Sequence, residues 1–407
     1  MTSVDPAILD ERFVQDPHAL YARLREEEQP VHRAVLPRGI TAWIVTRYAD
    51  ARAALSDPRL SKDSAGMRQV FQQRHTGDSG TPPAFSESLA THMLNTDPPD
   101  HTRLRKLVTT AFTSRAVETL RPRVEQITDE LLDAIEPGST VDLLDVLALP
   151  LPITVISELL GVPHEDRDDF RTWSNLIVSS GAREDVGAAG AAMAGFLSRL
   201  VASKRADPGQ DMLSALVAVR DADDRLSEVE LVSMAFLLLV AGHDTTVNLI
   251  GNGMLALLRD IDQLAALRAD SSLLPGAIEE FLRYDGPVNL ATLRFTTECV
   301  EIGGVRIPRA ALVLVSLASA NRDPERFVDP DAVDVTRQAG GHLAFGHGIH
   351  HCLGAPLARM EAEVAFGRLL ARFGDIELAV AAGELRWRES TLMRGLHALP
   401  VRLDSAG

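Results

Sequence analysis

The chain has 407 residues, of which 45% are hydrophobic and 24% charged, and its formal net charge is −16. This composition is that of a soluble globular protein, and the negative charge argues against a nucleic-acid partner. Two cysteines exclude a disulfide framework and fit a reducing compartment. Residues 1–6 lack the features of a signal peptide, and the longest apolar run, residues 234–242, is too short to span a bilayer. We therefore expect a cytoplasmic protein without a membrane segment.

The N-terminal part of the chain predicts helices with a few strands. A first helix is expected at residues 17–28, and strand-like residues 31–36 and 42–48 flank a turn at 37–39. Residues 57–95 are rich in Gly, Ser, Pro and Gln and lose this periodicity, so we predict a long loop there. The other helices expected in this part are at 49–56, 99–112, 116–135, 152–160, 165–178 and 187–204.

Residues 227–260 predict a long buried helix. Ser227 and Glu230 have the spacing of a capping box, and no proline interrupts the pattern that follows. At about 1.5 Å per residue this rod is about 50 Å long. It is apolar nearly all round except at its centre, where Asp244 and Thr245 are adjacent. Buried acids and hydroxyls are costly unless they are hydrogen-bonded, so this pair requires partners or a function.

The C-terminal part combines helices, short strands and a proline-rich meander at residues 321–334. Its expected helices are residues 273–284 and 353–373, and its strand-like segments are 290–296, 300–302 and 311–317, followed by a strand-rich tail. We find no internal repeat and no linker. The chain is therefore expected to form one mainly α domain over residues 1–407, with a minor β region.

Cys352 is the most informative residue. It lies in the run 345–354, Phe-Gly-His-Gly-Ile-His-His-Cys-Leu-Gly, immediately before an expected helix. Glycines allow a backbone to wrap a group and direct N–H bonds at it, and a helix N-terminus favours a thiolate. The run resembles the haem-ligand loop of the cytochrome P450 family at every fixed position. The resemblance implies that Cys352 is the axial iron ligand. It also implies that Phe345, Gly346, His350 and Gly354 contact the cofactor.

Two further motifs resemble the same family. Glu280 and Arg283 are three apart on one helix face and look like its E-x-x-R motif, which would lock the helix to the meander containing Arg322. Residues 241–246, Ala-Gly-His-Asp-Thr-Thr, resemble its oxygen-binding motif, which implies that Thr245 and Asp244 organise proton delivery to bound O2. The alternatives are a solvated ion pair and a threonine-induced helix bend with a satisfied aspartate.

Haem carries two propionates, so its site requires cations. Residues 97–105 resemble a family segment in which a histidine and an arginine bind these propionates, here His101 and Arg105, four apart on one face. Arg294 and His350 match the remaining family positions. The alternative for any one of them is surface solvation. A competing interpretation is a zinc site made from Cys352 and the histidines 342, 347, 350 and 351, but the spacing fits no zinc pattern.

The resemblance covers the whole chain and implies the triangular α-rich P450 fold with haem b as cofactor. We expect a haem-thiolate monooxygenase that inserts one oxygen atom from O2 into a hydrophobic substrate. No flavin, nicotinamide or iron–sulfur motif is visible, so electrons from NAD(P)H would arrive through ferredoxin reductase and ferredoxin. The candidate docking cations are Arg103, Lys106, Arg115 and Arg359. We expect a monomer.

Residues 241–253 and 389–396 most resemble actinobacterial members of the family that tailor macrolides and other polyketides. We therefore expect hydroxylation or epoxidation of such a molecule. The alternatives are a sterol-like or terpenoid hydroxylase, an oxidative-coupling relative, and a haem sensor without turnover. Asn289 and Thr292 are the polar groups expected to orient a substrate, and Glu87 is a candidate partner for an amino sugar. The pocket walls implied by the resemblance are Phe236, Val240, Ala241, Val288, Asn289, Leu290, Thr292, Leu293 and Leu392.

Overall fold

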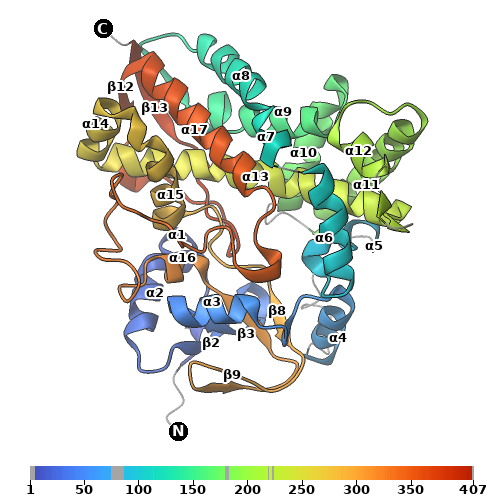
Figure 1. The fold of residues 1–407 in the computed structure, drawn as a ribbon. Coiled ribbons are helices and arrows are strands. Elements are labelled where there is room, and N and C mark those ends of the chain that lie inside the picture. Colours follow the sequence, from blue (N-terminus) through green and yellow to red (C-terminus); the bar gives the residue numbers. More distant parts are fainter. Residues whose placement is uncertain are drawn as a thin grey trace.

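A computed structural model describes residues 5–74, 87–112, 114–178, 183–218, 220–221 and 224–405. The long helix α13 (Glu228–Arg259) crosses the molecule, with helices α8 and α17 on one side of it and a smaller sheet-containing part on the other (Figure 1). The mainly α fold with small sheets is confirmed. The first short elements are β1 (Ala7–Ile8), α1 (Glu11–Gln15), α2 (Pro17–Glu26) and α3 (Tyr48–Ser56).

The main sheet has six strands in the order β1-β2-β3-β11-β8-β4. β2 and β3 pair antiparallel, as the two expected strands around a turn predict, and β11 runs parallel to β3. β4 pairs with β8, so Leu60 lies opposite Thr296. This pairing brings the segment after Leu60 beside the segment before Thr296. The strands are β2 (Val31–Val35), β3 (Thr41–Val45), β4 (Leu60–Ser61), β8 (Arg294–Thr296) and β11 (Leu312–Val315).

The loop expected at residues 57–95 is wrong where the structure describes it, because β4, α4 (Ser64–Arg74) and α5 (Glu87–Ala90) lie there. In α4, Met67, Val70 and Phe71 have helical spacing, and they pack against the N-terminal core. The polar residues around these three hide the pattern. Residues 75–86 and the side chain of Glu87 lie outside the described part of the chain.

Seven helices form the next part of the described chain. The single helix expected at residues 116–135 is divided into α7 and α8, because Pro122 in the first turn of α8 begins a new helix. The helices are α6 (Asp100–Ala111), α7 (Ser114–Glu118), α8 (Arg121–Asp133), α9 (Pro150–Leu159), α10 (Arg167–Val178), α11 (Arg183–Ala206) and α12 (Met212–Ala218).

Helix α13 begins at the predicted capping box. The backbone N–H of Ser227 donates to Glu230 Oε2 at 2.8 Å, and the N–H of Glu230 donates to Ser227 Oγ at 3.3 Å. The helix packs against α5, α9, α11, α15 and α17, which explains why it is apolar on most sides. α11 and α13 are long and apolar enough to cross a membrane, but 72% of the apolar stretch of α13 is buried inside the protein. A buried core helix meets the same criterion.

The remaining elements surround the cysteine loop. α15 and α17 pack against each other and against α13, and the cysteine loop enters the N-terminus of α17. The helices are α14 (Ile261–Ala269), α15 (Leu274–Asp285), α16 (Leu317–Asn321) and α17 (Ala355–Arg372). The strands are β5 (Ser139–Asp142), β12 (Phe373–Leu378) and β13 (Pro400–Ser405) in one sheet, and the pairs β6 (Arg220–Asp221) with β7 (Asp224–Arg225) and β9 (Val300–Ile302) with β10 (Val305–Ile307).

Candidate active site of a haem-thiolate protein

The backbone around Cys352 is tightly folded. The N–H of Cys352 donates to the carbonyl of Phe345 at 2.9 Å and closes the loop. Gly346 and Gly348 have φ of 72° and 73°, a region that side-chain-bearing residues rarely adopt. At Gly348 a Cβ atom would also lie only 3.1 Å from the carbonyl oxygen of Leu55. The glycines are therefore needed for the loop itself.

The Cys352 thiol receives the backbone donors that the sequence predicts. Burial raises its pKa, while N–H groups of Gly354 and Ala355 and the positive charge of Arg105 act in the opposite direction. The balance leaves the pKa raised, although the residue is accessible at the surface of the loop. A metal ion bound to the sulfur would displace the proton.

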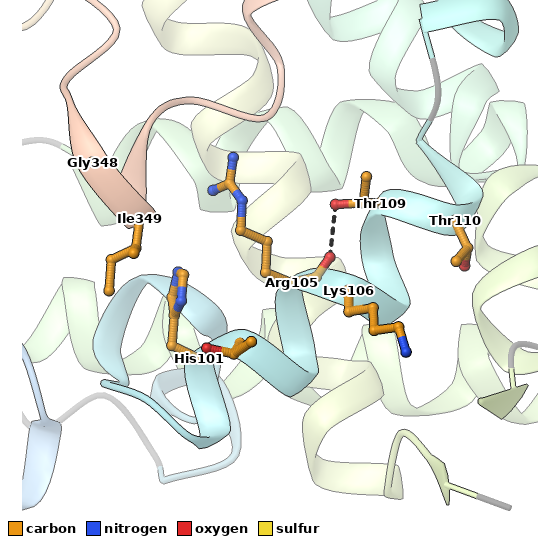
Figure 2. A pocket seen from close by; sticks show the side chains of 8 residues that line it. His101, Arg105, Lys106, Thr109, Thr110, Gly348 and Ile349 are labelled. Atoms are coloured by element: carbon orange, nitrogen blue, oxygen red, sulfur yellow. Dashed lines mark hydrogen bonds between the residues drawn. The ribbon is translucent and has the colours of Figure 1, made fainter. Parts of the chain in front are cut away.

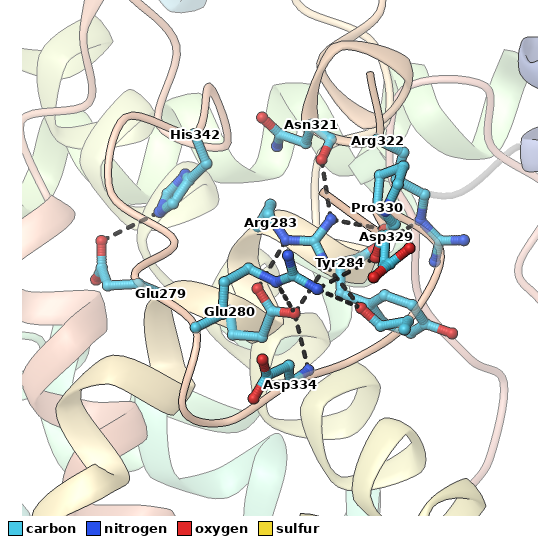
Figure 3. Close-up of polar contacts among 12 residues, drawn as sticks. Glu279, Glu280, Arg283, Tyr284, Asn321, Arg322, Asp329, Pro330, Asp334 and His342 are labelled. Carbon is cyan, nitrogen blue, oxygen red and sulfur yellow. Dashed lines mark hydrogen bonds and ion pairs between the residues drawn. The ribbon is translucent and has the colours of Figure 1, made fainter. Parts of the chain in front are cut away.

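Glu280 and Arg283 form a fully buried pair on α15, close to the meander (Figure 3). Arg283 Nε and Nη2 each donate to a Glu280 oxygen at 2.7 Å. The remaining donors of Arg283 reach meander carbonyls, those of Pro330 at 2.7 Å and Ala332 at 3.0 Å. The pair therefore joins α15 to the meander, and it is not the solvated alternative.

A further arginine, from the segment just after the meander, also contacts this pair. Arg337 Nε donates to Glu280 Oε1 at 3.1 Å, and sequence reasoning missed this residue. Arg322 instead donates to the carbonyl of Tyr284 at 2.7 Å and stacks on the Tyr284 ring at 4.0 Å (Figure 3). Both arginines hold the same helix end, and only the tertiary fold distinguishes their roles.

A second carboxylate supports the cysteine loop. Glu279 accepts hydrogen bonds from Arg359 at 2.5 and 2.8 Å and lies 3.1 Å from His342 Nε2. Burial raises the pKa of Glu279, but the contacts with Arg359 and His342 outweigh it and lower the pKa to about 2. The guanidinium of Arg359 also lies 4.5 Å from the ring centre of Phe345. Arg359 is thus engaged within the protein and is not a free docking cation.

The four cationic residues expected to bind propionates come from three separate elements. His101 and Arg105 lie on α6, Arg294 begins β8, and His350 precedes the cysteine. The rings of His101 and His350 are 4.4 Å apart, and Arg105 donates to the carbonyl of His351 at 2.7 Å. Figure 2 shows the α6 side chains beside Ile349, around an open pocket of about 530 Å³.

This cluster fits a carboxylate-bearing cofactor such as haem. His101 Nε2, Arg294 Nε and His92 Nδ1 are buried without a hydrogen-bond partner. Burial and the positive charges of Lys62 and neighbouring residues lower the pKa of His350 to about 2. Buried donors without acceptors are destabilising, and anionic oxygens would satisfy them. Sequence reasoning missed Lys62 and His92, because both lie in the segment predicted to be a loop.

The centre of α13 has one open face. Thr245 Oγ1 donates to the carbonyl of Ala241 at 2.8 Å, one turn earlier, as expected for a threonine that bends its helix. Ala241 is exposed and Thr245 half-buried, whereas most of the helix is buried. The adjacent His243 is fully buried and contacts Ser174 on α10, so it joins two helices.

Asp244, next to Thr245, is buried and bound to an arginine. Its two carboxylate oxygens accept hydrogen bonds from Arg388 at 2.8 and 3.0 Å, and Arg388 also donates to Asn248 at 3.1 Å. Asp244 is 4% exposed, so a cation is needed to stabilise its charge. Arg388 lies 144 residues later, and no pattern in the sequence links the two.

Three of the expected pocket residues are placed in the core. Phe236 and Leu290 are buried, and Asn289 accepts a hydrogen bond from Tyr21 at 2.8 Å and donates to the carbonyl of Thr391 at 3.1 Å. The amide of Asn289 is therefore used within the protein and is not a free group in a pocket. The accessible candidates are Val240, Ala241, Val288, Thr292, Leu293 and Leu392.

The zinc interpretation has no support in the described residues, where no group of three or more His, Cys, Asp or Glu side chains is placed to hold a metal. A single cysteine held by backbone N–H groups beside a cluster of buried cations is the arrangement of a haem-thiolate protein. The chain belongs to the cytochrome P450 family, because that family's model, described as Cytochrome P450, matches residues 153–378.

Three relatives support this assignment over nearly the whole chain. The solved structure of the tirandamycin C-bound P450 monooxygenase TamI is 56% identical, covers 98% of this chain and 100% of that chain, and has a TM-score of 0.91. Vitamin D(3) 25-hydroxylase of Pseudonocardia autotrophica is 50% identical over 96% of this chain and 94% of its own. 6-Deoxyerythronolide B hydroxylase of Saccharopolyspora erythraea is 48% identical over 99% of this chain and 100% of its own.

Members of the family bind haem, use O2 and receive electrons from redox partners. The predicted class of enzyme, a P450 monooxygenase acting on a hydrophobic small molecule, is confirmed by these relatives. The roles of the individual site residues remain predictions.

Proposed function

We propose that this monooxygenase hydroxylates or epoxidises a macrolide or another polyketide of comparable size. The observation that carries the proposal is the open face of α13 at Ala241 and Thr245. Accessible apolar side chains from two other segments, Leu293 and Leu392, belong to the walls that the family resemblance implies. A mostly apolar cavity with few polar groups suits a large hydrophobic substrate. Tirandamycin C and 6-deoxyerythronolide B, named for two relatives, support the same substrate class.

The chain's own residues would divide the work as follows. Haem b, when bound, supplies O2 activation and the oxidising chemistry. Cys352 would hold the metal, and the carboxylates would be held by His101, Arg105, Arg294 and His350. Thr245, whose hydroxyl lies on the open face, would hold a proton at Oγ1 and pass it on into the site. Asp244, held in place by Arg388, would help to organise the water that delivers the proton.

Thr245→Ala is expected to separate NAD(P)H consumption from product formation. Without the hydroxyl, protons arrive by uncontrolled water, so product per NAD(P)H should fall by about tenfold or more while hydrogen peroxide accumulates. Assays of all three quantities check this. Thr128→Ala is the matched control, because Thr128 Oγ1 makes the same bond to a carbonyl one turn earlier at 2.8 Å, in α8. Unchanged product per NAD(P)H in the Thr245 variant would contradict the proton-delivery role.

Electrons from NAD(P)H would come through a ferredoxin reductase and an acidic ferredoxin. The structure alters the docking surface expected from the sequence, because Arg103 pairs with Glu230 and Arg359 with Glu279. Lys106 and Arg115 are exposed, and Ile349, 47% exposed, lines the same pocket as Lys106. We therefore propose that docking centres on these three residues. The remaining expectations, a cytoplasmic monomer with one domain over residues 1–407, stay proposals.

A sterol-like or terpenoid hydroxylase is the second candidate function, which the vitamin D(3) 25-hydroxylase relative favours. A spectral screen distinguishes the substrate classes, because a substrate that displaces water from the haem iron shifts the Soret band. We expect at least one macrolide-sized or sterol-sized compound to bind with a Kd between about 1 μM and 1 mM. Leu293→Ala should change that Kd, whereas Leu264→Ala, in the core outside the pocket, should not. Binding of small phenols alone would contradict the proposal.

A haem sensor without turnover and an oxidative-coupling enzyme would have the same fold and the same metal ligand. Product analysis with a surrogate ferredoxin system separates them from a monooxygenase. An added hydroxyl or epoxide supports the proposal, whereas loss of two hydrogens with formation of a new ring bond indicates coupling. Absence of any turnover with every ligand that shifts the Soret band would favour the sensor.

A further inference from the structure

Lys62 is a buried lysine, and among the residues that the structure describes no carboxylate forms an ion pair with it. It follows β4 directly, it is 4% exposed, and its Nζ donates to Thr292 Oγ1 at 2.5 Å. An ammonium group has three N–H donors, and a hydroxyl oxygen satisfies only one of them without neutralising the charge. Burying such a charge costs free energy unless an anion compensates it.

The β4–β8 pairing places Lys62 among other cations. Leu60 pairs with Thr296, which brings Lys62 near Arg294 at the start of β8. Arg294 is 4% exposed, its Nε has no partner, and its Nη1 makes only a long contact of 3.5 Å with the carbonyl of Leu60. The positive charges of Lys62 and Arg294 both act on His350 beside the cysteine. Lys62 thus belongs to the same cluster as the predicted propionate-binding residues.

Asp97 is the carboxylate that acts on this cluster in the described part of the chain. It influences Lys62, Arg294 and His101. It accepts hydrogen bonds from the Ser61 hydroxyl and, at 3.2 Å, from the backbone N–H of Lys62. Its oxygens are therefore already engaged by the start of the same segment, and the ammonium of Lys62 has no ion pair with it.

The charges of this cluster balance only when Lys62 is included. Lys62, Arg105 and Arg294 carry three positive charges and Asp97 one negative charge, with neutral histidines. The surplus of two equals the charge of the two carboxylates of haem. Without Lys62 the surplus is one, which is one positive charge short of the two carboxylates. Burial and the charge of Arg294 lower the pKa of Lys62 well below its usual value, and the charge of Asp97 opposes this shift only in part.

We propose that Lys62 is a further cofactor-binding residue, whose ammonium group pairs with a haem carboxylate together with Arg105 and Arg294. This inference rests on the proposed haem site. The other predicted carboxylate-binding residues cannot supply this charge. Arg105 and Arg294 are already counted, and His101 and His350 are neutral.

Lys62→Met tests the proposal, because methionine keeps the length and the apolar stem without the charge. Transfer of ferric haem from the holoenzyme to apomyoglobin is expected to become about tenfold faster or more, because the variant loses one charge-assisted hydrogen bond to the haem. The midpoint potential of the haem should fall, because removing a nearby positive charge favours the oxidised state. Lys62→Arg should restore both values. Lys204→Met is the control, since Lys204 is partly buried and pairs with Asp211 at 2.7 Å, outside the cluster.

Lys62→Gln separates the charge of Lys62 from its hydrogen bond to Thr292. Glutamine retains a donor for the Thr292 hydroxyl, so a purely structural role predicts parental haem transfer and potential. The proposal instead predicts that Lys62→Gln, like Lys62→Met, transfers haem faster and has a lower midpoint potential. If Lys62→Met does not assemble with haem, the values of Lys62→Gln test the proposal. Parental values in both uncharged variants would overturn it. The ferrous–CO spectrum of these variants should stay that of a thiolate ligand, whereas a parent chain without that spectrum would refute the haem site itself.

Discussion

Cys352→Ala is expected to abolish the thiolate-type ferrous–CO spectrum of the protein. The sulfur is the one group that the loop surrounds with backbone N–H donors from Gly354 and Ala355, so no other side chain can take its place. The variant should either lose its haem during purification or retain it without the red-shifted band. Absorption spectra of the reduced, CO-treated protein and the haem content per chain measure both outcomes.

Cys299→Ala is the matched control for this experiment. Cys299 is exposed on the β9–β10 hairpin region, where its sulfur lies 3.0 Å from Arg306 Nε, and it takes no part in the site. Its replacement should leave the spectrum and the haem content unchanged. A parental spectrum in the Cys352 variant would refute the assignment of the metal ligand, and with it the proposed chemistry.

Arg283→Met is expected to be the most destabilising of the proposed substitutions. It leaves Glu280 buried without its bidentate partner and removes donors from the carbonyls of Pro330 and Ala332. Breaking a buried pair costs about 3–5 kcal/mol, because the remaining charge is uncompensated. Since the meander holds the cysteine loop through Asn321, which accepts from the N–H of Leu343 at 2.6 Å, haem content should fall as well. Denaturant unfolding and haem content are the measurements.

The comparison variants for Arg283→Met are Arg337→Met and Arg121→Met. Arg337 also contacts Glu280 but is partly accessible, so its loss should cost less than that of Arg283. Arg121 pairs with Glu118 on the surface, where exposed ion pairs contribute about 1 kcal/mol or less. Equal stabilities of the Arg283 and Arg121 variants would show that the buried network does not hold the meander.

Sequence reasoning succeeded where the interacting residues lie within one helical turn. Ser227 and Glu230 cap α13, Thr245 bonds to Ala241, and Glu280 pairs with Arg283, each at a separation of three or four residues. Helix geometry alone brings such residues together, so spacing is sufficient to predict the contact. The cysteine loop is equally local, because its glycines determine its backbone.

Sequence reasoning failed where the partner comes from a distant segment. Arg388 reaches Asp244 from the C-terminal region, and Arg337 reaches Glu280 from the segment that follows the meander. Lys62 was missed because its segment is polar and its neighbour Arg294 is brought beside it by strand pairing. A charged side chain in a polar segment is normally solvated, so nothing in its local sequence indicates burial.

The sequence by itself thus determined the long central helix, the family and the class of reaction, and it predicted the metal ligand, because the motifs that indicate them each lie within a loop or a single helix. Only the tertiary structure decided which charges neutralise one another, and which wall residues are accessible instead of buried. It placed Asn289 and Leu290 in the core and Lys62 in the cation cluster. The physical reason is that burial and charge pairing depend on packing between elements far apart in the chain, which local periodicity does not encode.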